Sequence, residues 1–214
     1  MSIVRFYWFC SDFGKKNSVQ YAEKLPESIA RTRTRIFELA MCNDWDFFVT
    51  LTVDSAKCNR KDLDEYHSKL SKWLNNYNKK HFTNIKYLLI PEQHKNGAWH
   101  MHGLIMGLPK DHVKPFLLTD RIPHKMKNMI KGGRTLFNWR AYAKKFGFVS
   151  MEPIRCKEST AKYITKYITK QASTTRIRPN DHMYYNNSGH ARFIVLWVMA
   201  VKSYLRGKEL FFSP

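Results

Sequence analysis

The stretch Trp99-His100-Met101-His102-Gly103 places two histidines on either side of one apolar residue. It opens an apolar run that ends at Met106 and predicts a strand. Because side chains alternate between the two faces of a strand, His100 and His102 share one face, and Met101 points from the other face into a core. Two neighbouring imidazoles can hold a divalent metal ion. Taken alone, the same pattern also fits any half-buried strand.

The composition is that of a basic globular protein. Hydrophobic residues make up 43% and charged residues 25% of the 214 residues, enough for one domain with a real core. A net charge of +20 favours a polyanionic partner, nucleic acid rather than a membrane. The longest apolar run, Phe193–Val201, is too short to span a bilayer, and no signal peptide is visible. We therefore expect a cytoplasmic protein, without membrane contact.

Two familiar motifs are missing from the sequence. The four cysteines are scattered without C-x-x-C spacing, which argues against a zinc finger and fits a reducing cytoplasm. No P-loop occurs, so residues 1–214 are expected to form one domain without a helicase. Unwinding of DNA would then need a separate helicase.

Positive charge is concentrated in the second half of the chain. Between Arg121 and Asn180 there are 15 Lys or Arg residues and two acids. A solvated surface would explain part of this excess, but its one-sidedness favours a nucleic-acid track. The residues expected to contact DNA are Lys144, Lys145, Lys162 and Arg176.

The remaining periodicities predict an α+β fold with an antiparallel sheet. Asn96-Gly97 is typical of a two-residue hairpin turn, which would pair the strand 85–90 with the histidine strand. Further strands are expected at 47–53 and 148–154, and helices at 28–42, 61–80, 139–146 and 159–171.

Residues 161–170, A-K-Y-I-T-K-Y-I-T-K, repeat every four positions. On a helix each residue type forms its own stripe, so Ile faces the core and the tyrosines lie at the edge of burial. Tyr163 and Tyr167 are one turn apart and can reach the same place. The lysines beside them, Lys166 and Lys170, would favour a phenolate and neutralise an attacked phosphate. A core helix with snorkelling lysines is the alternative.

Three motifs now follow in order: F-F-V-T-L-T-V-D at 47–54, His100-Met101-His102, and Tyr163-x-x-Lys166-Tyr167-x-x-Lys170. Together they resemble the HUH endonuclease superfamily, specifically the two-tyrosine initiators of rolling-circle replication in small phages and plasmids. The resemblance covers roughly residues 45–171.

The resemblance implies an RRM-like or ferredoxin-like fold, with a central antiparallel sheet of about five strands, the histidines on a middle strand, and helices packed on the sheet. It also implies Mg²⁺ or Mn²⁺ as cofactor. A tyrosine would attack one phosphodiester of single-stranded origin DNA, often in a hairpin. The products would be a 5′-phosphotyrosine bond and a free 3′-hydroxyl that primes a DNA polymerase of the bacterial host. A relaxase or single-strand transposase of the same superfamily, or a non-enzymatic nucleic-acid-binding protein, remain alternatives.

The resemblance implies a third metal ligand, usually a carboxylate or amide, and Glu92 is the expected one. A two-residue turn at Asn96-Gly97 would, however, place Gln93 opposite His100 and turn Glu92 to the wrong face. Glu92 therefore needs a bulge or an odd-length loop, which Pro91 makes reasonable. Gln93 and His94 remain alternatives.

Overall fold

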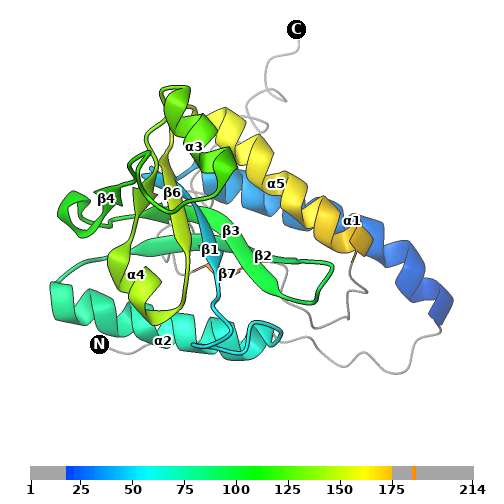
Figure 1. Cartoon of the computed structure of the whole chain (residues 1–214). Coiled ribbons are helices and arrows are strands. Elements are labelled where there is room, and N and C mark those ends of the chain that lie inside the picture. Colours follow the sequence, from blue (N-terminus) through cyan, green and yellow to red (C-terminus); the bar gives the residue numbers. More distant parts are fainter. Residues whose placement is uncertain (1–17, 175–184, 187–214) are drawn as a thin grey trace, which may run out of the picture.

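The computed structural model describes residues 18–174 and 185–186. Helices and strands alternate irregularly along the chain (Figure 1). The helices are α1 (Ser18–Met41), α2 (Leu63–His81), α3 (His124–Lys131), α4 (Arg140–Lys145) and α5 (Lys157–Thr174), with a 3-10 turn at Lys110–His112. The strands are β1 (Phe47–Thr52), β2 (Lys86–Gln93), β3 (Trp99–Met106), β4 (Lys114–Pro115), β5 (Phe137–Asn138), β6 (Val149–Pro153) and β7 (Tyr185–Asn186).

The strands form one antiparallel sheet in the order β4-β5-β6-β1-β3-β2-β7. This confirms the predicted α+β class, and β3 lies inside the sheet between β1 and β2. The sheet has seven strands instead of about five, because β4, β5 and β7 add two residues each at its edges.

Helices cover both faces of the sheet (Figure 1). One core cluster joins the sheet to α2 and α4, and the other joins it to α1 and α5. We call the second side the histidine face, because Thr50, Thr52, His100 and His102 alternate with the residues of the first cluster. The other side is called the α2 face.

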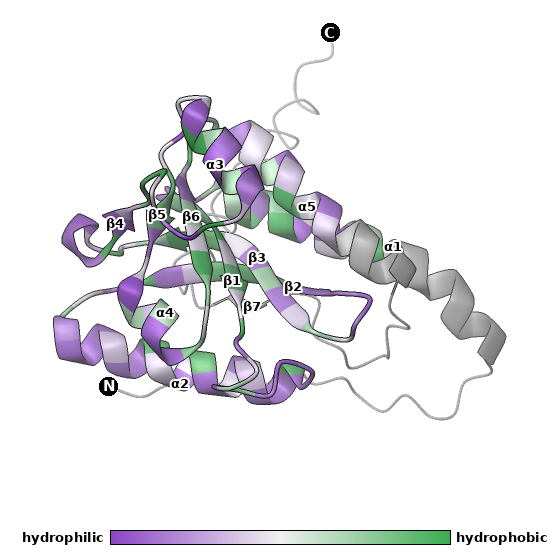
Figure 2. Cartoon of the chain, in the orientation of Figure 1, coloured by the Kyte–Doolittle hydropathy of each residue, from purple (hydrophilic) through white to green (hydrophobic). Residues whose placement is uncertain are grey.

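Helix α2 forms because its sequence suits both of its ends and one buried stripe. The Asp62 side chain caps the first turn by accepting a hydrogen bond from the Glu65 amide at 2.9 Å. Lys79, Lys80 and His81 complement the helix dipole in the last turn. The buried stripe is Tyr66, Leu70, Leu74 and Tyr77. Much of the rest of α2 is hydrophilic, whereas β1 and β6 are largely hydrophobic (Figure 2).

The hairpin between β2 and β3 corrects the predicted turn. His94 and Ala98 close it, so the loop has three residues, Lys95, Asn96 and Gly97, and Gly97 has φ +81°. A left-handed glycine at the third position is the usual solution for three-residue loops. The odd length shifts the register by one residue, so that Glu92 pairs with His100 and Gln93 pairs with Trp99. Pairing stays regular through Pro91, which lies opposite Met101.

Membrane insertion finds no support in the described residues, where no helix is long and apolar enough to cross a bilayer. The run Phe193–Val201 lies outside the described residues.

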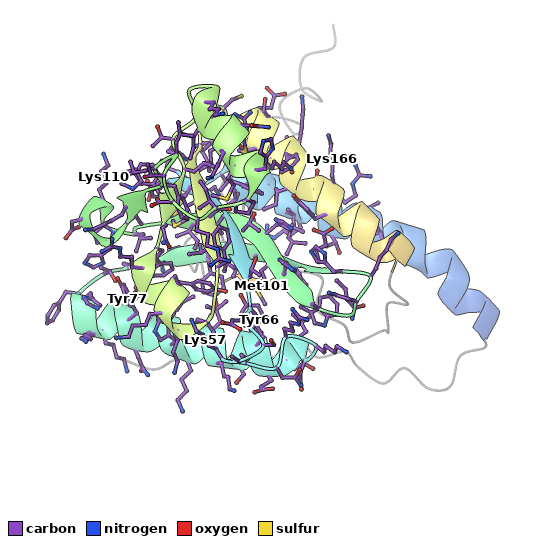
Figure 3. The ribbon with its side chains drawn as sticks, in the orientation of Figure 1. Lys57, Tyr66, Tyr77, Met101, Lys110 and Lys166 are labelled. Carbon is purple, nitrogen blue, oxygen red and sulfur yellow. The ribbon has the colours of Figure 1, made fainter. Side chains whose placement is uncertain are left out.

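Met101 shows how strictly the two faces of β3 differ. Its side chain is 0% exposed in the core of the α2 face, and in Figure 3 it lies with Tyr66 between the sheet and α2. We expect Met101→Asp to prevent folding, because an unpaired buried carboxylate costs several kcal/mol against a total stability of about 5–15 kcal/mol. Met101→Leu is the control and should cost less than about 1.5 kcal/mol. Urea unfolding followed by circular dichroism measures both; a folded Asp variant of normal stability would contradict this assignment.

Candidate metal and tyrosine site

Each histidine of β3 lies opposite a threonine of β1. Thr50 pairs with His102 and Thr52 with His100, as expected for a T-L-T strand next to the histidine strand. The Thr50 hydroxyl lies 3.1 Å from His102 Nδ1, and the Thr52 hydroxyl lies 3.0 Å from His100 Nδ1. These contacts fix the rings and engage Nδ1, which leaves Nε2 as the nitrogen for a further ligand.

A threonine hydroxyl suits this position because it both donates and accepts a hydrogen bond. When it accepts from Nδ1–H, Nε2 carries a lone pair and can bind a metal ion; when it donates to Nδ1, Nε2–H can donate to a carboxylate. Each threonine therefore serves either tautomer of its histidine.

Glu92 reaches the histidines on the same face. Its Oε2 lies 2.7 Å from His102 Nε2, and both side chains are 12% exposed. The odd-length hairpin loop is what brings it there. Because the carboxylate contacts the nitrogen that would bind an ion, the described residues contain no ready-made cluster of three or more His, Cys, Asp or Glu ligands. Two imidazoles and one carboxylate still make a donor set that suits a divalent cation.

The two alternative ligands fall in different places. Gln93 is paired with Trp99 on the α2 face, and its amide nitrogen donates to the Gly97 carbonyl at 3.4 Å. His94 packs against His100, with 4.0 Å between the ring centroids. His94 therefore stays near the site, whereas Gln93 points away from it.

His100 is held in its neutral form. Burial, followed by the neighbouring His94 and His102, lowers the pKa of His100 from 6.5 to about 4. A neutral imidazole is the form that ligates metals, so at neutral pH no proton has to leave this ring before an ion binds.

Helix α5 carries the tyrosines across the histidine face. Ala161 and Ile164 are 0% exposed and pack on the cluster formed with α1, as the four-residue repeat predicted for the apolar stripe. The Lys157 ammonium donates to Asp44 at 2.6 Å before β1 and ties the start of the helix down. The side chains at the edge of this apolar stripe are thereby directed at β3.

Tyr163 and Tyr167 meet above His102. The Tyr167 ring stacks on the His102 ring at 4.1 Å and 13°, and the Tyr167 hydroxyl donates to the Tyr163 hydroxyl at 2.9 Å. Tyr163 is 46% exposed, whereas burial and the bond to Tyr163 raise the pKa of Tyr167. The pair thus contains one accessible and one sheltered phenol over the same histidine.

Phe48 is a member of the site that the sequence did not single out. It lies 5.4 Å from the Tyr163 ring and 6.4 Å from the His102 ring, measured between centroids. Its position two residues before Thr50 places it on the histidine face, and this alternation was the available signal. Its ring supports Tyr163 from the sheet side.

The predicted basic residues do not gather at one place. Lys166 lies 6.0 Å from the centroid of the Tyr163 ring and projects from α5 (Figure 3). Lys162 is exposed on the same helix and paired with Glu158. Lys144 and Lys145 belong to α4, which packs on the α2 face, so they do not join the tyrosine site. Arg176 and the Lys170 side chain lie outside the described residues.

The threonines give a prediction that separates ring orientation from metal ligation. We expect the double variant Thr50→Val/Thr52→Val to fold but to bind Mn²⁺ about 10–100 times more weakly, because the histidines lose the hydroxyls that set their tautomers. Calorimetric titration with Mn²⁺ measures the effect. Thr50→Ser/Thr52→Ser is the control and should restore most of the affinity. Equal affinities of the valine variant and the wild type would contradict the role.

The fold and the site together define a class: α+β proteins with an open antiparallel sheet, paired histidines on an inner strand and tyrosines on a helix above them. A family model places the chain more narrowly. The model of the replication-associated protein ORF2 family matches residues 46–172, more than half of the chain, so the chain belongs to this family and is a Rep-like replication protein. No curated protein and no solved structure matches it.

Proposed function

We propose that the protein is a metal-dependent HUH endonuclease of the two-tyrosine type, which nicks and rejoins single-stranded DNA to initiate rolling-circle replication. The observation that carries the proposal is the pair Tyr163 and Tyr167 stacked over His102, whose neighbours His100 and Glu92 complete a metal-ligand set. Membership of a replication-associated family and the charge of +20 support DNA as the substrate.

The reaction is a transesterification. A tyrosine oxygen forms a bond to the scissile phosphorus, and the bond from phosphorus to the 3′ oxygen breaks. The phenol loses one proton and the departing 3′ oxygen gains one, so neither a redox partner nor a net proton is needed. The phosphotyrosine ester keeps the energy of the broken bond, and attack by the 3′-hydroxyl or by the second tyrosine reverses or transfers the linkage.

His100, His102 and Glu92 would hold the ion, Mg²⁺ or Mn²⁺. When bound, the ion supplies Lewis-acid polarisation and orientation of the scissile phosphate. The chain's own groups do the rest: Thr50 and Thr52 hold the imidazoles, and Lys166 adds positive charge beside Tyr163.

Tyr163 is proposed as the first nucleophile. It is the more exposed phenol, and it accepts the hydrogen bond from Tyr167, which favours its ionised form. Tyr167 is the donor in that bond, and burial disfavours its ionisation. Once Tyr163 is esterified, Tyr167 loses this acceptor and becomes the phenol available for the second transfer.

The deciding experiment is incubation of the protein with labelled single strands from the replicon that encodes it, in the presence of Mn²⁺. We expect a denaturation-resistant protein–DNA adduct that EDTA prevents. Binding without an adduct on any strand would favour a non-enzymatic DNA-binding protein. An adduct only at a transfer origin or a transposon end would favour a relaxase or a transposase.

A further inference from the structure

A basic pocket lies away from the tyrosines, on α3 and the turn that follows it. It has a volume of about 510 Å³ and is open to solvent. Its lining combines cationic groups with one amide and one thioether: His124, Lys125, Asn128, Met129, Gly132 and Arg134. We call it the α3 pocket. No step of the proposed reaction uses it.

One ion pair places the α3 pocket on the histidine face. Arg134 Nη1 lies 3.6 Å from Glu152 Oε2 on β6. Val149 and Met151 of β6 belong to the core of the α2 face, so Glu152 points to the histidine face. From β6 the sheet continues to β1 and then to the histidine strand β3, a lateral distance of about 10 Å. Figure 1 shows α3 and α5 together on the side away from α2.

The charge around the α3 pocket is of one sign. Residues 121–151 contain eight Lys or Arg and no Asp or Glu, and Glu152 ends this run. Glu152 offsets part of the charge of Arg134, while Lys125 has no such acid in this stretch. Cationic groups around an open hollow suit a phosphate, and Met129 offers an apolar surface for a sugar or a base.

We propose that the α3 pocket binds a backbone phosphate of the same DNA strand whose scissile phosphate lies at the tyrosines. This inference rests on the proposed function and adds a second anchor to it. With two anchors on one sheet face, a strand is held in a fixed register across β1 and β6, and the second contact sets how far the substrate must extend beyond the cleavage site.

The chain supplies a matched control on the opposite side. A second hollow of about 560 Å³ lies on the outer surface of α2 and contains Lys72 and Lys79. Because α2 covers the other face of the sheet, Lys72→Gln/Lys79→Gln removes the same two charges far from the histidine face. Lys125→Gln/Arg134→Gln is the test variant.

The experiment measures anisotropy of fluorescein-labelled oligo(dT) of graded length, with Tyr163→Phe/Tyr167→Phe in every protein so that nothing is cleaved. For long strands we expect the test variant to flatten the slope of log affinity against log salt by about 1.4, at about 0.7 per lost contact. The control variant should leave the slope unchanged. Strands too short to span both places should bind the test variant and its parent equally.

Two results would overturn the inference: equal slopes for the test and control variants, or an equal loss of affinity at all lengths, which would indicate a free-phosphate site. Circular dichroism of both variants checks that they are folded. Failure of the proposed function looks different, because it leaves the protein with native tyrosines unable to form an adduct whatever the length dependence shows.

Discussion

Replacing Tyr163 and Tyr167 together by Phe is expected to abolish the covalent DNA adduct, lowering the nicking rate by about three orders of magnitude or more. Binding should persist, because both rings keep their contacts with Phe48 and His102 and lose only the two hydroxyls that bond to each other. The measurement is adduct formation on single-stranded DNA with Mn²⁺, alongside anisotropy for binding.

The single variants test the order of attack. Tyr163→Phe should lose the first cleavage. Tyr167→Phe should still cleave, about tenfold more slowly, because Tyr163 loses a hydrogen bond worth about 1.5 kcal/mol in its charged form. It should also fail to complete the second transfer. Peptide mapping of the trapped adduct identifies the nucleophile: a DNA-linked residue other than these two would refute the mechanism, and Tyr167 as the first would reverse the order.

The second large effect is expected from His100→Ala/His102→Ala. This variant should lose Mn²⁺ binding and nicking while it stays folded, because the histidine face around these rings is polar and the core packing of β3 comes from Met101 on the other face. Calorimetry with Mn²⁺ and the adduct assay measure the two losses. Full nicking by this variant would remove the metal site from the mechanism.

Single substitutions then identify the third ligand. Glu92→Gln should weaken Mn²⁺ binding strongly, since its carboxylate is the group beside His102 Nε2. His94→Ala is the matched control: it removes a ring that packs against His100 from the same hairpin and should cost little. The opposite ranking would make His94 the ligand.

Much of the fold was predictable because the responsible signals are local. The alternation in residues 47–52 and 99–106 and the four-residue repeat of α5 depend only on backbone periodicity, and the structure confirms these elements. Element ends were less accurate: α1 begins at Ser18 and β2 extends to Gln93, because neighbouring elements supply partners that a local pattern does not contain. The short strands β4 and β5 carry no periodicity of their own.

By itself, the sequence determined which residue types stand one turn or two strand positions apart, and hence that two histidines share a face and two tyrosines share a stripe. Tertiary structure decided the rest. A three-residue loop set the register that turns Glu92 toward His102, the packing of α4 put Lys144 and Lys145 on the α2 face, and the crossing of α5 over β3 stacked Tyr167 on His102. Spacing along a chain fixes only the face of an element; loop length and packing fix which faces meet.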